Sequence, residues 1–388
     1  MDETDANVLV QSLFDFVTIY CESDELDCST IHVYGCDQDR NQDRKQCLET
    51  AIRIGRIDYL REYYPYIEKH EESFRSLLVT ACKFGQVTLL RYMIDKNLAS
   101  SSSSALLYSS LVGLLLEAAT YTHVSVFRYF KPLLTKEDAQ KVVDHLLFHI
   151  ISQGNVKLLR ELRLHWFLTK EIIATRDYTA VKLCGIHGHA KILRALRIHW
   201  NLTVEHARVS NNYTLRTAAH RGNVKVLVEL RKNWHLTRED ARVDNNATLQ
   251  NAVQGGHLNV IKELRKNWNL TANDARAANT ISLRLAAQFG HVHILREFRR
   301  HWNLTLPDVQ SENNQALKMA LGRYDIPVLI ELVKWNITTS RARERNKQTL
   351  EYARQHARID ILEQLCTNPI FNTEEDPAIT QLYDLTVD

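Results

Sequence analysis

Two adjacent stretches of the chain decide its fold, because they are close copies of one another. Residues 212–245 read NYTLRTAAHRGNVKVLVELRKNWHLTREDARVDN, and residues 246–279 read NATLQNAVQGGHLNVIKELRKNWNLTANDARAAN. In the second copy the apolar positions Leu249, Ala252 and Val253 share one helical face, as do Leu258, Ile261 and Leu264 further on. Gly256 separates them, and helix ends favour a residue that tolerates positive φ. Each copy is therefore predicted to form two short amphipathic helices.

The period of the copies runs through most of the 388 residues. All six Trp fall in one series with spacings of 34, 34, 34, 34 and 33: Trp166, Trp200, Trp234, Trp268, Trp302 and Trp335. A Gly series keeps step with it: Gly154, Gly188, Gly222, Gly256 and Gly290. Weaker copies lie around Gly55, Gly85, Thr122, Tyr324 and Ala357. The sequence thus predicts an all-α array of about ten stacked helix pairs over residues 46–366, since neither helix of a pair can bury its apolar face alone.

Composition agrees with such an array and bounds the rest of the chain. Only 12 Gly and 6 Pro are present, too few for the many tight turns of sandwiches and barrels. Residues 1–50 carry 12 acidic and 3 basic residues, whereas residues 151–310 carry 25 Lys and Arg against 12 Asp and Glu. We expect an acidic cap at residues 1–45, a basic middle, and an acidic, flexible tail at residues 367–388. Scattered Cys residues and the lack of a signal or membrane-length apolar run favour an intracellular, cytoplasmic protein, the nucleus remaining open.

The pattern L-x-x-A-A-x-x-G-H-x-x-V-L-x-x-L is similar to the core of the ankyrin repeat, with Gly256-His257 and Gly290-His291 as its Gly-His. The Asn-Asn-x-x-Leu-Arg-x-Ala-Ala variant resembles the divergent ankyrin arrays that giant DNA viruses encode. The resemblance implies an elongated α-solenoid whose concave face binds a protein. Two departures stand out: the Thr-Pro-Leu-His turn is replaced by Tyr213-Thr-Leu-Arg and its equivalents, and Trp stands where ankyrin repeats have Gly after the second helix.

The segment between repeats, here called the finger, reads Leu-Thr-x-x-Asp-Ala-Arg. Thr237 precedes Asp240 by three residues, as Thr271 does Asp274 and Thr305 does Asp308. This spacing resembles a capping box with Asp for Glu and predicts a short extra helical turn. The usual β-hairpin fingers should then be shortened or replaced. An Asn series at the next helix start suits stacked caps or turns: Asn211, Asn245, Asn279, Asn313 and Asn346.

Two basic ladders are the candidate binding surfaces. The first runs along the first helices, and with its neighbours four residues on gives the predicted partner-binding residues Lys182, Arg216, His220, Gln250, Gln254, Arg284, Gln288 and Lys318. We expect these side chains to be exposed on or near the concave face. The second ladder ends the second helices: Arg163, Arg197, Arg231, Arg265 and Arg299. Helix-dipole complementarity also accounts for this second ladder.

Other recurring features are better explained by structure than by chemistry. The Trp column should fill the space between repeats, the His after each Gly should make local hydrogen bonds, and Asn-Leu-Thr should be a turn rather than a glycosylation site. Cys21, Cys28, His32, Cys36 and Cys47 match no standard zinc spacing. No phosphate loop or catalytic motif occurs. We therefore expect no catalytic residues, no cofactor and no metal.

The leading hypothesis is a non-enzymatic scaffold for protein–protein interaction, with a host protein as partner if the chain is viral. An acidic partner would suit the first ladder. The alternative is binding of nucleic acid or another polyanion by the basic middle, which would weaken steeply with salt. No membrane association is expected, and the sequence leaves the oligomeric state open.

Overall fold

The computed structural model describes residues 48–58, 60–61, 71–100, 106–323 and 325–336, and every regular element in these ranges is a helix. The chain divides into two compact units, Met1–Leu77 and Leu78–Asp388. In the described part of the first unit, residues 48–54 are helical and end at Gly55, whose φ is +86°. Ser76 Oγ donates there to Glu49 Oε1 at 3.2 Å. The predicted acidic cap and tail lie outside the described residues, as do the copy around Ala357 and the Cys-rich segment.

The helices have the following bounds. The first helices of successive copies, with their fingers, are α4 (Glu71–Lys83), α6 (Leu106–Thr120), α8 (Lys136–Ser152), α10 (Lys170–His187), α12 (Val204–His220), α14 (Arg238–Gln254), α16 (Ala272–Gln288), α18 (Leu306–Val309) and α19 (Ser311–Arg323). The second helices are α5 (Val87–Ser100), α7 (Val124–Phe130), α9 (Val156–His165), α11 (Ala190–Trp200), α13 (Val224–Lys232), α15 (Leu258–Asn267), α17 (Val292–His301) and α20 (Ile326–Val333). Two 3₁₀ turns, η2 (Lys131–Leu133) and η3 (Lys334–Asn336), follow α7 and α20.

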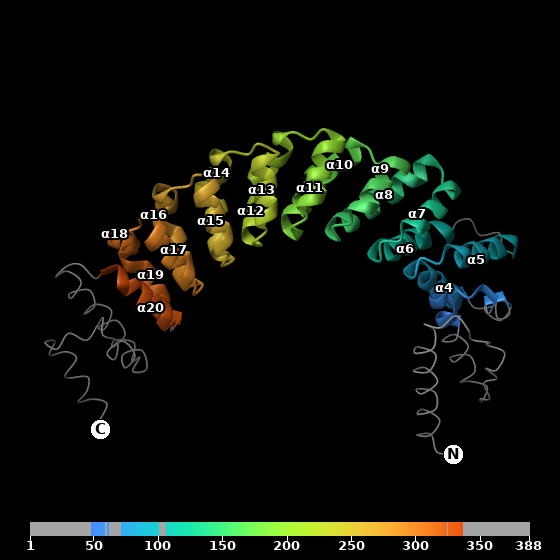
Figure 1. Cartoon of the computed structure of the whole chain (residues 1–388), viewed down its shortest axis with the longest axis horizontal. Helices are drawn as coiled ribbons and strands as arrows, with labels where there is room; N and C mark the ends of the chain where they lie inside the picture. Colours follow the sequence, from blue (N-terminus) through green and yellow to red (C-terminus); the bar gives the residue numbers. More distant parts are fainter. Residues whose placement is uncertain (1–47, 59, 62–70, 101–105, 324, 337–388) are drawn as a thin grey trace, which may run out of the picture. The chain divides into compact units, whose positions relative to one another are not determined.

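The helices of the second unit pack in chain order, which confirms the predicted all-α repeat architecture (Figure 1). From α6 through α8, α10, α12, α14 and α16 to α19, each first helix contacts the next first helix. The second helices from α5 to α17 do the same through the odd-numbered series, and α17 contacts α20. Five of the six apolar side chains predicted for this copy are fully buried between these two layers: Leu249, Ala252, Val253, Ile261 and Leu264. The sixth, Leu258, is half-buried. Each copy therefore obtains its core from its neighbours.

The Gly series ends the first helices as predicted. Gly222 has φ +77° and Gly256 φ +75°, the left-handed region that favours Gly. The ring of the next copy's His lies against each of them: a Cβ on Gly222 would stand 2.6 Å from Nδ1 of His257. That ring also bonds the same helix end, with His257 Nε2 lying 2.9 Å from the carbonyl of His220. The expectation that these His residues make hydrogen bonds is confirmed, but the bonds reach the preceding copy and are not local.

The Trp column is buried, as predicted, with exposed fractions of 0–8%. Edge-on aromatic contacts hold two members: Trp166 lies 5.6 Å from Phe127, and Trp302 lies 5.6 Å from Phe298. Only one of the six indoles has an acceptor for its N–H within the described residues, the bond from Trp200 Nε1 to the carbonyl of Leu168 at 3.1 Å. The rings therefore serve by filling volume, and none is presented for stacking on a ligand.

The finger forms the predicted extra helical turn, but a four-residue kink that was not predicted joins this turn to the next helix. In α14 the turn over residues 238–242 is followed by an extended residue, Val243, and then by three residues in the left-handed region, Asp244, Asn245 and Asn246. The same four-residue kink occurs at 175–178, 209–212 and 277–280. The members of the Asn series described here occupy its centre, with φ of 55–57° at Asn211, Asn245 and Asn279.

Asn suits this kink because its short polar side chain tolerates the left-handed region better than most non-Gly residues. Bonds between neighbouring kinks add to this: Ser210 Oγ donates to Asp177 Oδ2 at 2.7 Å, and Asn279 Nδ2 donates to Glu312 Oε1. The fourth residue of the kink is buried at Asn212, Asn246 and Thr280. It can reach the next finger, as where Asn212 Nδ2 donates to the carbonyl of Asp240 at 3.1 Å. A left-handed turn thus replaces the β-hairpin of the resembled family.

Candidate partner-binding surface

The side chains of the first ladder brace the left-handed kinks. Arg216 Nε donates to the carbonyl of Asn211 at 2.8 Å, and its Nη2 donates to that of Ser210 at 3.0 Å. Gln250 Nε2 makes the equivalent bond to Asn245 at 2.7 Å, and Arg284 Nη2 donates to Ala278 at 3.2 Å.

Lys182 lies beside the carboxylate of Asp177 and Arg216 beside that of Asp244, at 2.5 and 3.6 Å. The ladder residues are half-buried, so the expectation of freely exposed side chains was wrong: their long chains fold back onto carbonyls that the kink leaves without helical partners.

The other predicted site residues lie along the same helices. His220 and Gln288 are half-buried, Gln254 is exposed, and Lys318 is half-buried on α19. His220 and Gln254 offer their carbonyls to the next copy's His, with 3.3 Å between the Gln254 carbonyl and His291 Nε2. The structure therefore brings the eight residues together as one row over α10, α12, α14, α16 and α19.

The fingers carry a second row of charge, in which each copy bonds the next. Arg208 Nε donates to Asp240 Oδ1 at 2.7 Å, Arg242 Nε to Asp274 at 2.6 Å, and Arg276 Nε to Asp308 at 2.7 Å. Each of these carboxylates also caps its own finger, as where the N–H of Thr271 donates to Asp274 Oδ2 at 2.7 Å. The capping-box prediction is confirmed for these three fingers. In the Asp-Ala-Arg motif, the Asp thus accepts hydrogen bonds from the Arg of the previous copy, and the Arg donates to the Asp of the next copy.

These contacts set the protonation of the finger carboxyls. Burial alone would raise the pKa of Asp274, but the hydrogen bonds from Arg242 and Thr271 outweigh it and hold the pKa below its usual value. The same balance lowers the pKa of Asp240, with Arg208 and Thr237 as donors, and of Asp308, with Arg276 and Thr305. The finger acids are therefore ionised structural groups.

The second basic ladder is also used between copies. Arg231, Arg265 and Arg299 pair with Glu263, Glu297 and Glu331, at 3.4, 3.1 and 2.9 Å. An upstream set adds Arg128 to Glu161, Arg194 to Glu229 and Arg296 to Glu331, at 3.0, 2.8 and 3.1 Å. Glu161, Glu229, Glu297 and Glu331 are buried. These pairs hold adjacent second helices together from α11 to α20, and Arg128 joins α7 to α9 in the same way.

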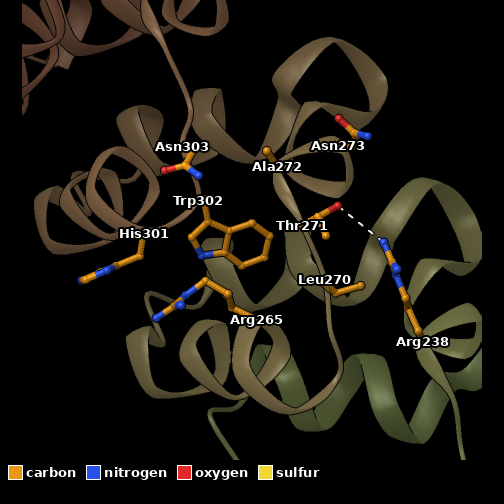
Figure 2. Close-up of a pocket in the computed structure, with 9 residues that line it drawn as sticks. All are labelled: Arg238, Arg265, Leu270, Thr271, Ala272, Asn273, His301, Trp302 and Asn303. Atoms are coloured by element: carbon orange, nitrogen blue, oxygen red, sulfur yellow. Dashed lines mark hydrogen bonds between the residues drawn. The ribbon is translucent and has the colours of Figure 1, made fainter.

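A surface hollow of about 550 Å³ lies where a finger meets the ends of two second helices. Figure 2 shows Trp302 beside Arg265, with Thr271 and Arg238 across from it. Arg238 Nη2 lies 3.3 Å from Asp274 Oδ2, and Arg265 pairs with Glu297, so both cations of the hollow are already partnered.

Sequence reasoning missed the acids of both ion-pair rows. The signal was present as a recurring interval: an Arg followed by Asp 32 residues later in the fingers, and by Glu 32 or 35 residues later in the second helices. These intervals are close to the period of 34, so the two residues of a pair lie in neighbouring copies. In a single copy, each acid is naturally interpreted as interacting within that copy.

The comparisons with known proteins supply no family: neither a family model nor a curated protein matches the chain. Among the described residues, no group of three or more His, Cys, Asp or Glu side chains could hold a metal ion. No helix in that part of the chain is long and apolar enough to cross a membrane. The Cys-rich segment, whose spacing matches no standard zinc site, lies outside these residues.

Proposed function

We propose that this chain is a non-enzymatic scaffold that holds another protein along its repeats. The observation that carries the proposal is the row of eight ladder residues, which recurs copy after copy at the surface of the first helices. Stacked arrays bind through such long, rigid rows, because each copy presents its side chains in the same orientation. The fold and the Gly-His pattern also support membership of the ankyrin-like arrays, of the divergent type that giant DNA viruses encode.

Bracing makes the row better suited to binding. Long basic side chains lose rotamer entropy when a partner immobilises them, and that loss is smaller where backbone carbonyls already fix them. Arg216 and Arg284 are fixed in this way. An acidic protein surface would be attracted to this row, and a host protein is the expected partner for a viral chain.

The experiment uses a substitution that the chain itself supplies. Gln250 makes the same brace to the kink as Arg216 without its charge. A partner is first captured and identified at low and at high salt. The double variant Arg216→Gln, Arg284→Gln should keep the fold and slow association with that partner roughly tenfold at low salt, with a weaker salt dependence. Unchanged association would refute this surface. Lys225→Gln, which removes an exposed charge on α13 outside the row, serves as the control.

Nucleic-acid binding is the second candidate, favoured by the basic balance of residues 151–310. Phosphate contacts would make its affinity fall steeply as salt rises. Many of these bases are paired with acids of the next copy, which reduces the charge available to phosphates. Binding of single-stranded or duplex DNA with a steep salt slope, and no salt-tolerant protein partner, would favour this candidate over the scaffold.

A further inference from the structure

From α9 to α20, the row of acids along the second helices is interrupted at one place. Where α9, α13, α15, α17 and α20 carry Glu161, Glu229, Glu263, Glu297 and Glu331, α11 carries Ala195. The pairing in the last copy shows what the missing acid would do: Glu331 accepts from both Arg296 and Arg299. By the period of 34, the residues equivalent to these two are Arg160 and Arg163 on α9, and the residue equivalent to Glu331 is Ala195.

Arg160 and Arg163 are consequently left without an acid among the described residues. Nε of Arg163 is buried and has no hydrogen-bond partner there. The two guanidinium groups lie close enough to His199 on α11 to act on it: burial first, and then the charges of Arg163 and Arg160, lower the pKa of this His. Ala195 is itself only half-buried, so the place of the absent carboxylate is open to an incoming group.

Large apolar side chains are exposed beside this gap. Leu164 on α9 is 49% exposed, and Ile198 at the equivalent position of α11 is 51% exposed. Later copies place charge at the same position: Lys232, Lys266 and Arg300. Phe167, 42% exposed just after α9, has Lys131 Nζ at 4.8 Å and Lys136 Nζ at 5.5 Å from its ring centroid. Leu164 shares a helical face with Arg160 by its spacing, and Ile198 lies on α11, which contacts α9. Exposed apolar residues on neighbouring helices are typical of an interaction surface.

The acids near this surface are already engaged. Glu161 is buried and bound by Arg128 at 3.0 Å. Glu171, at the start of α10, has a lowered pKa because its carboxylate accepts a hydrogen bond from the Thr169 hydroxyl and, second in importance, from the Glu171 backbone N–H. Ile172 stands where later fingers carry Asp240, Asp274 and Asp308, so the finger row also lacks its acid here. The surface of α9 and α11 is therefore apolar with unpaired positive charge.

We propose that this surface, defined by Arg160, Arg163, Leu164, Phe167 and Ile198, docks an acidic segment of a partner protein that also carries aliphatic or aromatic side chains. A partner carboxylate takes the place of the missing glutamate and bonds Arg160 and Arg163, while its apolar neighbours cover Leu164, Ile198 and Phe167. Charge-assisted bonds from two guanidinium groups fix the register, and the apolar contacts supply affinity. The inference rests on the proposed scaffold function but concerns the second helices, whereas the proposed function concerns the first.

The test uses the full chain and a short fluorescein-labelled peptide that alternates Glu with Leu and Phe, read by fluorescence polarisation. Two variants introduce the residue types that other copies carry at the same positions, and we therefore expect both variants to fold. Ala195→Glu supplies the missing acid, and the pair Leu164→Lys, Ile198→Lys supplies the charge of later copies. Each should weaken peptide binding about tenfold or more, because most interface energy comes from a few central contacts. Val156→Lys, an exposed apolar position at the other end of α9, is the matched control and should leave binding within about twofold.

Two control peptides and a mass measurement separate the alternatives. A peptide with Lys for Glu, or Ser for Leu and Phe, should not bind. No binding of the acidic apolar peptide to the wild type would overturn the proposal, as would equal binding to Ala195→Glu. Self-association of the wild type that Leu164→Lys, Ile198→Lys abolishes would assign the surface to a second copy of the chain. The two proposals can fail separately. If the peptide does not bind but Arg216→Gln, Arg284→Gln still slows association with the captured partner, this inference is refuted and the proposed function of the first-helix row stands.

Discussion

Removing one finger carboxylate, by Asp274→Ala, gives the sharpest test of how the copies are held together. Five donor atoms converge on this side chain, which is 4% exposed: Arg242 Nε at 2.6 Å and Nη2 at 3.2 Å, Arg238 Nη2 at 3.3 Å, and Thr271 N and Oγ1 at 2.7 and 3.1 Å. The variant leaves Arg238 and Arg242 unpaired at the interface of two copies and removes one of the two bonds of the capping box that begins α16. Both losses act on the same contact between fingers.

The magnitude follows from burial. Breaking a fully buried ion pair from one side costs about 3–5 kcal/mol. The side chain of Arg242 is 36% exposed and that of Arg238 is 33% exposed, so water solvates part of each freed guanidinium. We therefore expect the free energy of unfolding to fall by about 2–3 kcal/mol. A double-mutant cycle with Arg242→Gln should give a coupling energy of about 1–2 kcal/mol.

Urea unfolding followed by Trp fluorescence measures the global loss, and native-state hydrogen exchange shows where it falls. In a stacked array stability is a sum over copies and their interfaces, so exchange should quicken most in α16 and at its contact with α14. A loss below about 0.5 kcal/mol, with no coupling to Arg242, would place this pair among the surface salt bridges of negligible value and refute the reasoning.

The pH dependence should carry the same signature. Because the folded-state pKa values of Asp240, Asp274 and Asp308 are lowered, ionisation of these groups stabilises the fold fully above their unfolded pKa of about 3.9. That contribution is lost as pH falls from this value through the lower folded-state pKa. Asp274→Asn should therefore flatten the fall of the melting temperature with acid. An unchanged acid profile would contradict the assignment.

Three further outcomes follow. Trp234→Ala, at a position 1% exposed, should lower the free energy of unfolding by about 3–5 kcal/mol, and unchanged urea stability would show that the ring is not a core element. Ala278→Gly, at φ +48° in the kink, should raise thermal stability by up to about 1 kcal/mol, whereas a loss would mean that the kink is not left-handed in solution. Burial raises the pKa of Cys82 to about 12 and raises that of Cys184 too, so iodoacetamide at pH 8 should leave both unmodified until the chain is unfolded, as read by peptide mass spectrometry.

The sequence determined the helix pairs because its signals for them are local. Three signals each depend on a few neighbouring residues: Gly222 and its equivalents, the apolar stripes and the Thr-x-x-Asp caps. The structure contains the corresponding helix ends, buried faces and capping boxes at the expected positions. The left-handed kink was not foreseen, since a run such as Asp244-Asn245-Asn246 is equally suited to an ordinary turn. What selects the kink is contact with the next copy, for example Asn212 on the carbonyl of Asp240.

The candidate site was harder to predict for the same reason. Lys182, Arg216 and Arg284 looked like a solvated row because a helical pattern shows which face a side chain is on, and not which carbonyl it reaches. The exceptional place, Ala195, is invisible in one copy by itself. Alanine is an ordinary residue in a helix, so its position becomes informative only because the equivalent residue, Glu331, pairs with two arginines in the structure.

The Asp-Ala-Arg finger also bears on how such a chain could change its length. From the finger of α12 to that of α18, each copy offers its neighbour the same donor and acceptor at the same interval, so these copies are interchangeable partners. Excising residues 246–279 would join Asn245 to Thr280 and bring Arg242 to Asp308, Arg231 to Glu297, and the helix end at Gly222 to His291. Unequal recombination in whole periods would then yield chains that still close every interface. The array can gain or lose a copy in one genetic step, while a shift of a single residue would misalign all three rows at once.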